Sequence, residues 1–378
     1  MILTNEQEMI RDSIRAYAQE RIAPHAAEWD KHSTFPRAAL KGLAELGVLG
    51  MVVPEEWDGA GLGYLELGLA LEEIAAADGA TSTIVSVQNS LACMILLKYG
   101  TDDLRQEWLK PLARGEKLGC FCLTEPHVGS DAGAITTTAR REGDDWVING
   151  VKQFITTGKE GDVAIVFAVT DKAAGKKGIS TFLVPTRTPG YIVARLEDKI
   201  GQHASDTAQI LFENCRIPAA KLLGKEGEGY KIALSNLEGG RIGIASQCIG
   251  MARAALEAAV RYAKERTSFG KPLSEHQAIA FMLADMATQI DVARQSVWHA
   301  ASLRDAGRPC LKEASQAKLF ASQMAEKVCS DAIQVHGGYG VTMDFPVERI
   351  YRDVRVCQIY EGASEIQKLV IARAVLAD

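Results

Sequence analysis

Residues 146–155 read WVINGVKQFI, and this stretch decides the fold. Apolar and aromatic residues flank Asn149-Gly150, and Asn-Gly between two such runs is the strongest short signal for a β-hairpin turn. Further apolar strand candidates follow, each bounded by Gly, Pro, Asp or Asn, at 163–170, 179–185, 191–196 and 208–213. Together these segments predict a small β-barrel or β-sandwich domain over residues 120–228.

Helical periodicity precedes the β segment. Thr4 and Gln7 have capping-box spacing, and an apolar stripe follows at helical intervals at Ile10, Ile14, Tyr17, Ala18 and Ile22. Ala/Leu/Glu-rich segments continue, separated by Gly or Pro, at 39–46, 64–78, 82–99 and 102–113. We therefore expect an N-terminal helical domain over residues 1–119.

Helical periodicity returns after Pro218 and the glycine-rich stretch 224–229. Long Ala-rich segments then cover 230–265, 273–306, 311–336 and 346–376, with few turn signals inside them. They predict an antiparallel four-helix bundle over residues 229–378. The predicted fold class is a multi-domain α+β protein in the order α, β, α.

Composition and charge exclude several classes of protein. The 378 residues are 47% hydrophobic and 24% charged, and 42 Lys and Arg against 48 Asp and Glu give a formal net charge of -6. A nucleic-acid binder needs a basic surplus to neutralise phosphates, so no such partner is expected. No uninterrupted apolar run has the length of a spanning helix, and the N-terminus lacks a basic-then-apolar leader pattern. We therefore expect a cytoplasmic protein with no membrane partner.

Neither a metal site nor a common nucleotide-binding loop is indicated. The eight cysteines are dispersed, and Cys120 and Cys122 lack the second Cys or His pair of a zinc site, so small, buried, reduced residues are expected. The glycines at 59–63 imitate a dinucleotide loop, but their spacing is wrong, and an ordinary turn before a helix is favoured. The stretch 224–229 lacks the Gly-Lys-Ser/Thr ending of a P-loop.

Four segments combine glycine, hydroxyl and aromatic residues in ways that packing alone does not require. They are FCLTEPHVGSD at 121–131, FITTG at 154–158, ERTSFG at 265–270 with HQ at 276–277, and a C-terminal series with QVHGGYG at 334–340 and YEGASE at 360–365. In the order and spacing of these segments, the chain resembles the acyl-CoA dehydrogenase family over all 378 residues.

The resemblance implies an enzyme, an FAD-dependent oxidoreductase that converts an acyl-CoA thioester to the trans-2-enoyl-CoA. In this reaction a carboxylate removes the α-proton, and the β-hydrogen leaves as hydride to the flavin N5. The resemblance further implies electron transfer to an electron-transfer flavoprotein. It also implies a homotetramer, a dimer of dimers, in which neighbouring subunits share each FAD site.

The resemblance places the catalytic base at Glu361, with Gly362 beside it able to supply a backbone N–H to the substrate carbonyl. Taken without the motifs, Glu361 is better explained as a surface carboxylate between two helices. Some relatives carry the base on an earlier helix, at a position that is Gly240 here and cannot act as one. Glu238 lies two residues earlier on a different helical face and is the weak competitor.

The remaining site residues are assigned by the same resemblance. Ser130 and Arg241 are expected on the substrate, with a helix salt bridge as the alternative role of Arg241. Phe154 stands where the family often has Trp, and its aromatic ring can still stack on the flavin. Ala363 stands where Thr is common, so one hydroxyl contact to the cofactor is missing. The expected FAD residues are Phe121, Leu123, Thr124, Ser130, Phe154, Thr156, Arg266, Phe269, Gln277, Gln334, Gly337, Gly338, Ala363 and Glu365. His203 stands where many relatives have Arg, and it is given no role.

Residues 237–245 and 361–364 look most like the short-chain and short-branched-chain members. Butyryl-CoA-like or 2-methyl-branched substrates are expected, with medium-chain acyl-CoA next. The pathway, fatty-acid β-oxidation or branched-chain amino-acid catabolism, stays open. Two rivals remain: an acyl-CoA oxidase, which is usually longer, and a non-catalytic flavin-binding regulatory relative, against which Glu361 and the acidic balance argue.

Overall fold

The N-terminal helices form where the sequence signals place them. Thr4 caps α1 (Asn5–Arg21) through a complete capping box with Gln7, and Ile14, Ala18 and Ile22 of the apolar stripe are buried. In the computed structural model, which describes residues 2–377, the following helices are α2 (Ala26–His32), α3 (Arg37–Glu45), α4 (Tyr64–Ala77), α5 (Gly79–Val87), α6 (Met94–Tyr99), α7 (Asp102–Leu104) and α8 (Lys110–Ala113). The glycines at 59–63 are the predicted turn, and Gly63 is the N-cap of α4.

A π-helical segment, Gln88–Cys93, joins α5 and α6 into one continuous helical stretch. Among the described residues, this stretch (Gly79–Tyr99) is the one helix long and apolar enough to cross a membrane, but 94% of its most apolar window is buried inside the protein. The polar Gln88 side chain is bonded there too, since its amide donates to the carbonyl oxygens of Leu112 and Lys117. The stretch therefore has the contacts of a core helix.

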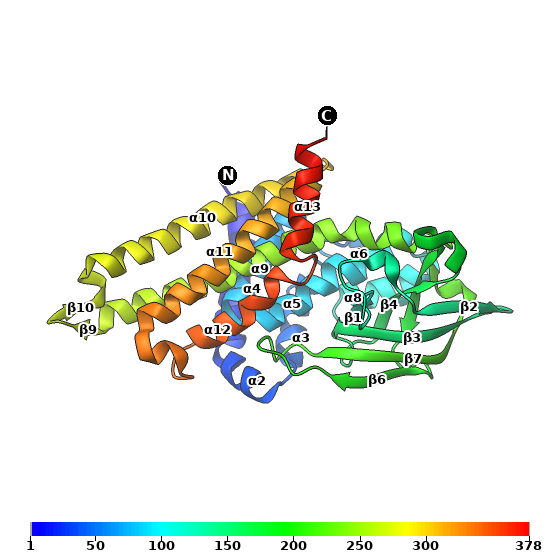
Figure 1. Ribbon diagram of the computed structural model, residues 1–378, viewed down its shortest axis with the longest axis horizontal. Coiled ribbons are helices and arrows are strands. Elements are labelled where there is room, and N and C mark those ends of the chain that lie inside the picture. The colour runs from blue at the N-terminus through cyan, green and yellow to red at the C-terminus, as the bar shows by residue number, and fades with distance from the viewer. Residues whose placement is uncertain (1, 378) are drawn as a thin grey trace.

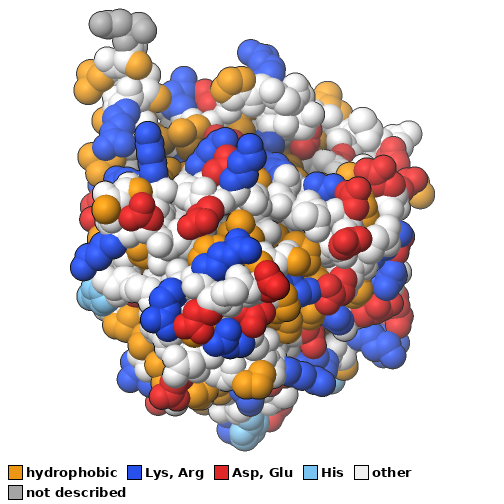
Figure 2. Space-filling view, turned by 90° about the vertical axis from the view of Figure 1, so that its right-hand side faces the viewer, with side chains coloured by type: hydrophobic (Ala, Val, Ile, Leu, Met, Phe, Trp, Pro, Cys, Tyr) orange, Lys and Arg blue, Asp and Glu red, His pale blue; other side chains and the backbone are white. Residues whose placement is uncertain are grey.

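One eight-stranded sheet forms the β domain, at one end of an elongated molecule (Figure 1). Its strands are β1 (Gly119–Cys122), β2 (Thr138–Glu142), β3 (Asp145–Thr156), β4 (Val163–Val169), β5 (Ile179–Pro185), β6 (Tyr191–Leu196), β7 (Thr207–Pro218) and β8 (Leu222–Leu223). The order across the sheet is β6-β7-β3-β2-β4-β5-β8, and β1 pairs in parallel with β4. The four strands predicted after residue 160 are confirmed as β4, β5, β6 and β7. Figure 2 looks at this end of the molecule and shows basic and acidic side chains interspersed over it.

The predicted hairpin at Asn149-Gly150 is wrong. Strand β3 passes straight through both residues, and the chain reverses earlier, at Gly143-Asp144 between β2 and β3. Both halves of β3 pair with the same partner, β7, so no reversal is possible at its centre. Gly150 instead accommodates a register shift, with a φ of 149° and no room for a side chain, because a Cβ there would lie 2.5 Å from the Thr137 hydroxyl.

The C-terminal helices pack against the N-terminal ones. α9 (Gly229–Glu265), α10 (Gln277–Asp305) and α11 (Leu311–His336) pack against one another, and α4 packs against both α9 and α10. A single apolar core consequently contains Ile14 and Leu43 from the first part of the chain and Ala321 and Val354 from the last. The α, β, α order and the fold class are confirmed, while the domain boundaries at residues 119 and 228 stay predictions.

The prediction of a fourth long helix over 346–376 is also wrong. That helix is replaced by α12 (Val347–Val354), a short 3-10 turn, a loop and α13 (Ser364–Val375). The loop contains Glu361 with φ of 53° and Gly362 with φ of 94°. A left-handed backbone cannot continue a right-handed helix, so the apolar periodicity on both sides belongs to two separate helices.

Buried charges join the N-terminal and C-terminal helices. Glu72 and Glu73 of α4 are 6% and 3% exposed. Arg15 of α1 pairs with Glu73 at 2.8 Å, Arg253 of α9 contacts both carboxylates, and Arg294 of α10 pairs with Glu72 at 3.0 Å. Four helices thus meet at two adjacent carboxylates.

Replacing Glu73 by Gln should destabilise the protein while preserving its shape. The amide cannot neutralise the two guanidinium groups, and loss of one partner from a buried pair typically lowers the free energy of unfolding by about 3 kcal/mol. Chemical denaturation at fixed protein concentration measures the change. The control is Glu20→Gln on helix α1, where the carboxylate is 70% exposed. Equal midpoints for the two variants would contradict the assigned role.

Candidate active site

The first two motif segments meet at the edge of the β domain. The Gln153 N–H donates to the Thr124 carbonyl oxygen at 2.8 Å, which docks the chain after β1 onto β3. Phe121, Leu123 and Thr124 are therefore brought beside the end of β3, where Phe154 and Thr156 lie. Phe154 has a φ of 58° at a register shift, and its ring is 61% exposed instead of packed in the sheet.

A buried ion pair between Lys152 and Glu125 holds the loop after β1 against β3. Lys152 is 0% exposed, and its ammonium donates to the Leu123 carbonyl oxygen at 3.0 Å and to Glu125 Oε1 at 2.9 Å. Glu125 also accepts from the backbone N–H groups of Thr136 and Thr137. Burial opposes ionisation of Glu125, but Lys152 and these donors lower its pKa to about 2. The loop from β1 is therefore anchored by a charge that stays ionised.

The Glu361 carboxylate lies against the glycine at the alternative base position. A Cβ built on Gly240 would come within 2.6 Å of Glu361 Oε2 and 3.1 Å of Oε1. Oε2 is buried and has no hydrogen-bond partner among the described residues. The space that a side chain at position 240 would need is thus occupied by the carboxylate from position 361, and the surface interpretation of Glu361 is wrong.

Burial raises the pKa of the Glu361 carboxyl to about 7, while Arg241 and Lys318 act in the opposite direction. Arg241 is 3% exposed, donates to the Ser315 hydroxyl at 3.1 Å and has a buried Nε without a partner in the part of the chain described. A carboxylate with this pKa can exchange a proton near neutral pH.

Glu238, the competing carboxylate, is engaged elsewhere. One of its oxygens pairs with Arg304 at 3.1 Å and accepts from the Cys310 thiol at 3.8 Å. The Arg304 guanidinium also stacks over the Tyr64 ring, 4.2 Å from its centroid. Glu238 thus belongs to a separate ion-pair cluster.

The loop that carries Glu361 is held by residues that the sequence reasoning missed. Tyr360 donates to Gln247 Oε1 at 2.8 Å, and Lys318 and Gln367 each donate to the Gly362 carbonyl oxygen at 2.8 Å. A signal for Lys318 was present, because it falls within the apolar stripe of α11. That stripe contains Ala314, Ala317, Ala321, Ala325 and Val328.

Another group of predicted residues lies at the far end of the bundle. A cavity of about 630 Å³ is lined by Arg266, Gln334, Gly337 and Gly338 among others. Both glycines face open space, and the buried Nε2 of the adjacent His336 has no partner among the described residues. A guanidinium and exposed backbone N–H groups suit a phosphate-like anion.

The other predicted residues lie outside this cavity. Phe269, 96% exposed, is next to the short hairpin of β9 (Thr267–Ser268) and β10 (Lys271–Pro272), and Gln277 is exposed at the start of α10. Ser130 is exposed on its loop, Ala363 is the N-cap of α13, and Glu365 is exposed in the first turn of that helix. Figure 1 shows the β9–β10 hairpin and the sheet at opposite ends of the long axis, so the two groups of predicted cofactor residues do not meet within one chain.

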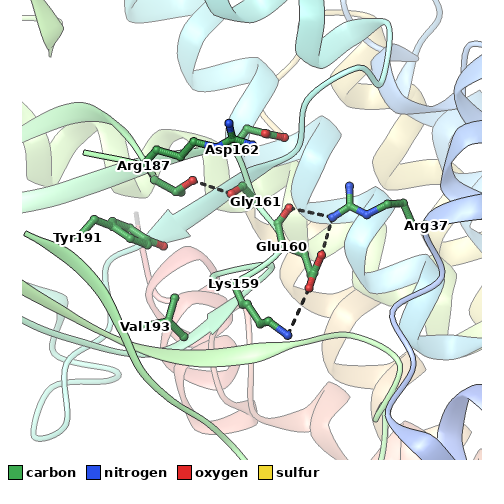
Figure 3. A pocket seen from close by; sticks show the side chains of 9 residues that line it. Arg37, Lys159, Glu160, Gly161, Asp162, Arg187, Tyr191 and Val193 are labelled. Carbon is green, nitrogen blue, oxygen red and sulfur yellow. Dashed lines mark hydrogen bonds and ion pairs between the residues drawn. The ribbon is translucent and has the colours of Figure 1, made fainter. Parts of the chain in front are cut away.

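A smaller polar cavity of about 430 Å³ follows the FITTG segment and contains none of the predicted residues. Figure 3 shows Glu160 bridging Arg37 and Lys159 across it. The Tyr191 hydroxyl donates to the Gly158 carbonyl oxygen at 2.7 Å, which holds the end of the segment.

Comparison with known proteins gives concordant matches. Family models for acyl-CoA dehydrogenase match in three parts, the N-terminal domain over residues 4–116, the middle domain over 120–215 and the C-terminal domain over 227–376. The chain is 50% identical over 374 residues to the mitochondrial short-chain specific acyl-CoA dehydrogenase of Mus musculus, covering 99% of this chain and 91% of that protein.

Solved structures agree over the whole length. Butyryl-CoA dehydrogenase from Megasphaera elsdenii matches with a TM-score of 0.97 at 40% identity, covering 100% of both chains. A chain in a structure described as the electron transferring flavoprotein of Acidaminococcus fermentans matches with a TM-score of 0.98 at 46% identity, again over 100% of both chains.

The protonation of Glu361 can be measured directly. The infrared band of its protonated carboxyl, identified by its loss in Glu361→Gln, should reach half intensity at about pH 7. Below that pH the group is protonated and cannot accept a proton. A midpoint near the ordinary value of 4.5 would mean that the carboxylate is open to water and not desolvated.

Proposed function

The chain belongs to the acyl-CoA dehydrogenase family, and on that premise we propose that it oxidises short-chain acyl-CoA thioesters with Glu361 as the base. Membership of the family makes it an oxidoreductase that uses FAD. The observation that carries the assignment of the base is the unpartnered Glu361 Oε2 against Gly240. Sequence identity to the short-chain specific enzyme supports the substrate class, with 2-methyl-branched and medium-chain thioesters as the alternatives.

The residues around Glu361 account for proton abstraction. Its carboxylate accepts the α-proton, and a pKa of about 7 matches the proton affinity of the base to neutral conditions. The Gly362 N–H supplies a donor to the thioester carbonyl, which makes the α-proton more acidic. Gln367 donates to the Glu361 carbonyl oxygen at 3.2 Å, on the same peptide group as that N–H, and so strengthens it as a donor. FAD, when bound, supplies the acceptor for the hydride that leaves the β-carbon.

The residues present fit FAD in two places. Phe121, Leu123, Thr124, Phe154 and Thr156 would hold its flavin end, where an exposed aromatic ring offers a stacking surface. Arg266, Gln334, Gly337 and Gly338 would hold the pyrophosphate end of a second FAD in the 630 Å³ cavity. Because the first group lies on the β domain and the second at the far end of the helical bundle, each FAD would be completed by a neighbouring subunit, as in a homotetramer built as a dimer of dimers.

We further propose an electron-transfer flavoprotein as the electron acceptor. The match to a chain described with such a flavoprotein supports this partner over oxygen. The retained, desolvated Glu361 argues against a non-catalytic flavin-binding relative. A cytoplasmic role in fatty-acid β-oxidation is the setting that fits, and branched-chain amino-acid catabolism is the alternative.

Replacing Glu361 by Gln should abolish flavin reduction while leaving FAD bound. The amide is nearly isosteric but cannot accept a proton at neutral pH, and a positioned base contributes about 10² to 10⁴ in rate. Rapid mixing with butyryl-CoA under anaerobic conditions measures the bleaching of the flavin. Glu238→Gln is the matched control and should keep most of the rate, because Glu238 pairs with Arg304. Near-normal bleaching in Glu361→Gln, or loss of bleaching only in Glu238→Gln, would contradict the assignment of Glu361 as the base.

Replacing Arg266 by Ala should lower the amount of FAD that co-purifies, without unfolding the chain. The guanidinium lines the far cavity and is exposed in a single chain, so its loss removes a phosphate contact and little packing. Absorbance of the released flavin per chain gives the FAD content. Arg261→Ala, one turn earlier on α9 and also exposed, is the control. Full FAD content in a verified monomer would rule out a shared site.

A further inference from the structure

Lys318 is a charged residue in the middle of an apolar helix face. Its side chain is 0% exposed, and its ammonium donates to the Gly362 carbonyl oxygen at 2.8 Å, 44 residues further along the chain. Burying an ammonium is unfavourable unless a specific partner compensates for the lost water. Here the partner is the loop that presents Glu361.

The loop needs such support because Glu361 has an unfavourable backbone conformation. Glu361 and Gly362 both have left-handed φ angles, and residues other than glycine rarely adopt them. Gln367 of α13 donates to both carbonyl oxygens of the loop, at 3.2 Å to Glu361 and at 2.8 Å to Gly362. Lys318 of α11 provides a second contact to the Gly362 carbonyl oxygen, and unlike Gln367 it is a charged donor.

The titratable groups around Glu361 come from four elements. Arg241 of α9 and Lys318 of α11 face its carboxylate and lower its pKa, against the effect of burial. Arg241 in turn is influenced by Glu238 on its own helix. Lys318 also faces two buried thiols, Cys248 of α9 and Cys357 of the 3-10 turn after α12.

Tyr360, the residue before Glu361, is also titratable. Its hydroxyl contacts four side chains from other elements: Gln247 of α9, Gln202 of the loop before β7, Thr83 of α5 and the Cys357 thiol.

We propose that Lys318 is a positioning residue that holds the Glu361–Gly362 loop against Gly240 through its bond to the Gly362 carbonyl oxygen. A positive charge held there also stabilises the ionised Glu361 carboxylate. The inference rests on the proposed function, since it concerns the base of that reaction. Lys318 acts through Glu361 and touches neither substrate nor cofactor in this role. Its effect should therefore appear in the proton affinity of Glu361, not in the binding of FAD.

The sign of the effect follows from the charge. Without the ammonium, the negative carboxylate loses a stabilising neighbour, so the pKa of Glu361 rises. A shift of about one pH unit leaves about tenfold less of the base ionised at any pH well below the midpoint. Flavin reduction by butyryl-CoA should fall by about this factor at acid pH and recover at alkaline pH.

The test compares Lys318→Met with Lys327→Met. Both residues are on α11, but Lys327 is 62% exposed and pairs with Asp331 on the same helix. Methionine keeps the length and apolar stem of lysine and removes the charge and the donor. The expected result is an infrared midpoint of the Glu361 carboxyl about one unit higher in Lys318→Met, with the acid limb of the bleaching rate moved by the same amount. FAD content and the Lys327→Met variant should match the unmodified protein.

An unchanged midpoint and pH profile in a folded Lys318→Met would overturn the proposal. A uniform loss of rate at every pH, with an unmoved midpoint, would overturn it as well, because that is the result of general structural damage. If Lys318→Met does not yield folded protein, Lys318→Gln decides on the same criteria, since it removes the charge but keeps a polar group. The infrared midpoint does not depend on turnover, so the Lys318 effect can be read even if Glu361→Gln were to bleach normally and the proposed function failed.

Discussion

The arrangement of the candidate active site depends on one interruption, the left-handed break at Glu361-Gly362 in a region whose periodicity is helical on both sides. A continuous helix would bond its own carbonyl groups and would direct position 361 along its surface. The break frees the carbonyl oxygens of the loop, and Lys318 and Gln367 bond to them instead. It also carries the carboxylate across to α9, where Gly240 leaves room for it. Glutamate at position 361 therefore requires glycine at position 240, because a side chain there would collide with the carboxylate.

Buried charges connect parts of the chain that are far apart in sequence. Lys152 and Glu125 fasten the loop after β1 to β3, and the Glu72–Glu73 cluster joins four helices. In both places each ion has a counter-ion at hydrogen-bonding distance, which offsets the loss of water around it. Glu361 differs, because its Oε2 is buried with no partner in the described part of the chain. A buried carboxylate oxygen without a partner marks a place where a further group is expected.

The elongated shape separates the two groups of predicted cofactor residues. The exposed Phe154 ring belongs to strand β3 of the β domain, and the cavity with Arg266 is at the end of the molecule that carries the β9–β10 hairpin (Figure 1). Each surface is open in the isolated chain, and the Phe269 side chain beside the hairpin is almost fully exposed. These features are the physical basis of the proposal that neighbouring subunits complete each site.

Much of the fold followed from the sequence by itself, because amphipathic periodicity is a local property. The α, β, α order, the capping box of α1, the strands β4 to β7 and the turn before α4 were all predicted from runs of fewer than 20 residues. The motif segments and their family resemblance also led to Glu361 and to Arg266, Gln334, Gly337 and Gly338 of the far cavity as candidate site residues. Local patterns failed where a distant partner decides the conformation. Asn149-Gly150 has hairpin chemistry, yet pairing of both halves of β3 with β7 keeps the strand straight. The periodicity of 346–376 is helical, yet contacts from Lys318 and Gln367 stabilise a break within it. Only the tertiary structure could place the Glu361 carboxylate against Gly240, since that contact joins residues 121 positions apart, and no local periodicity encodes which side chains meet across a core.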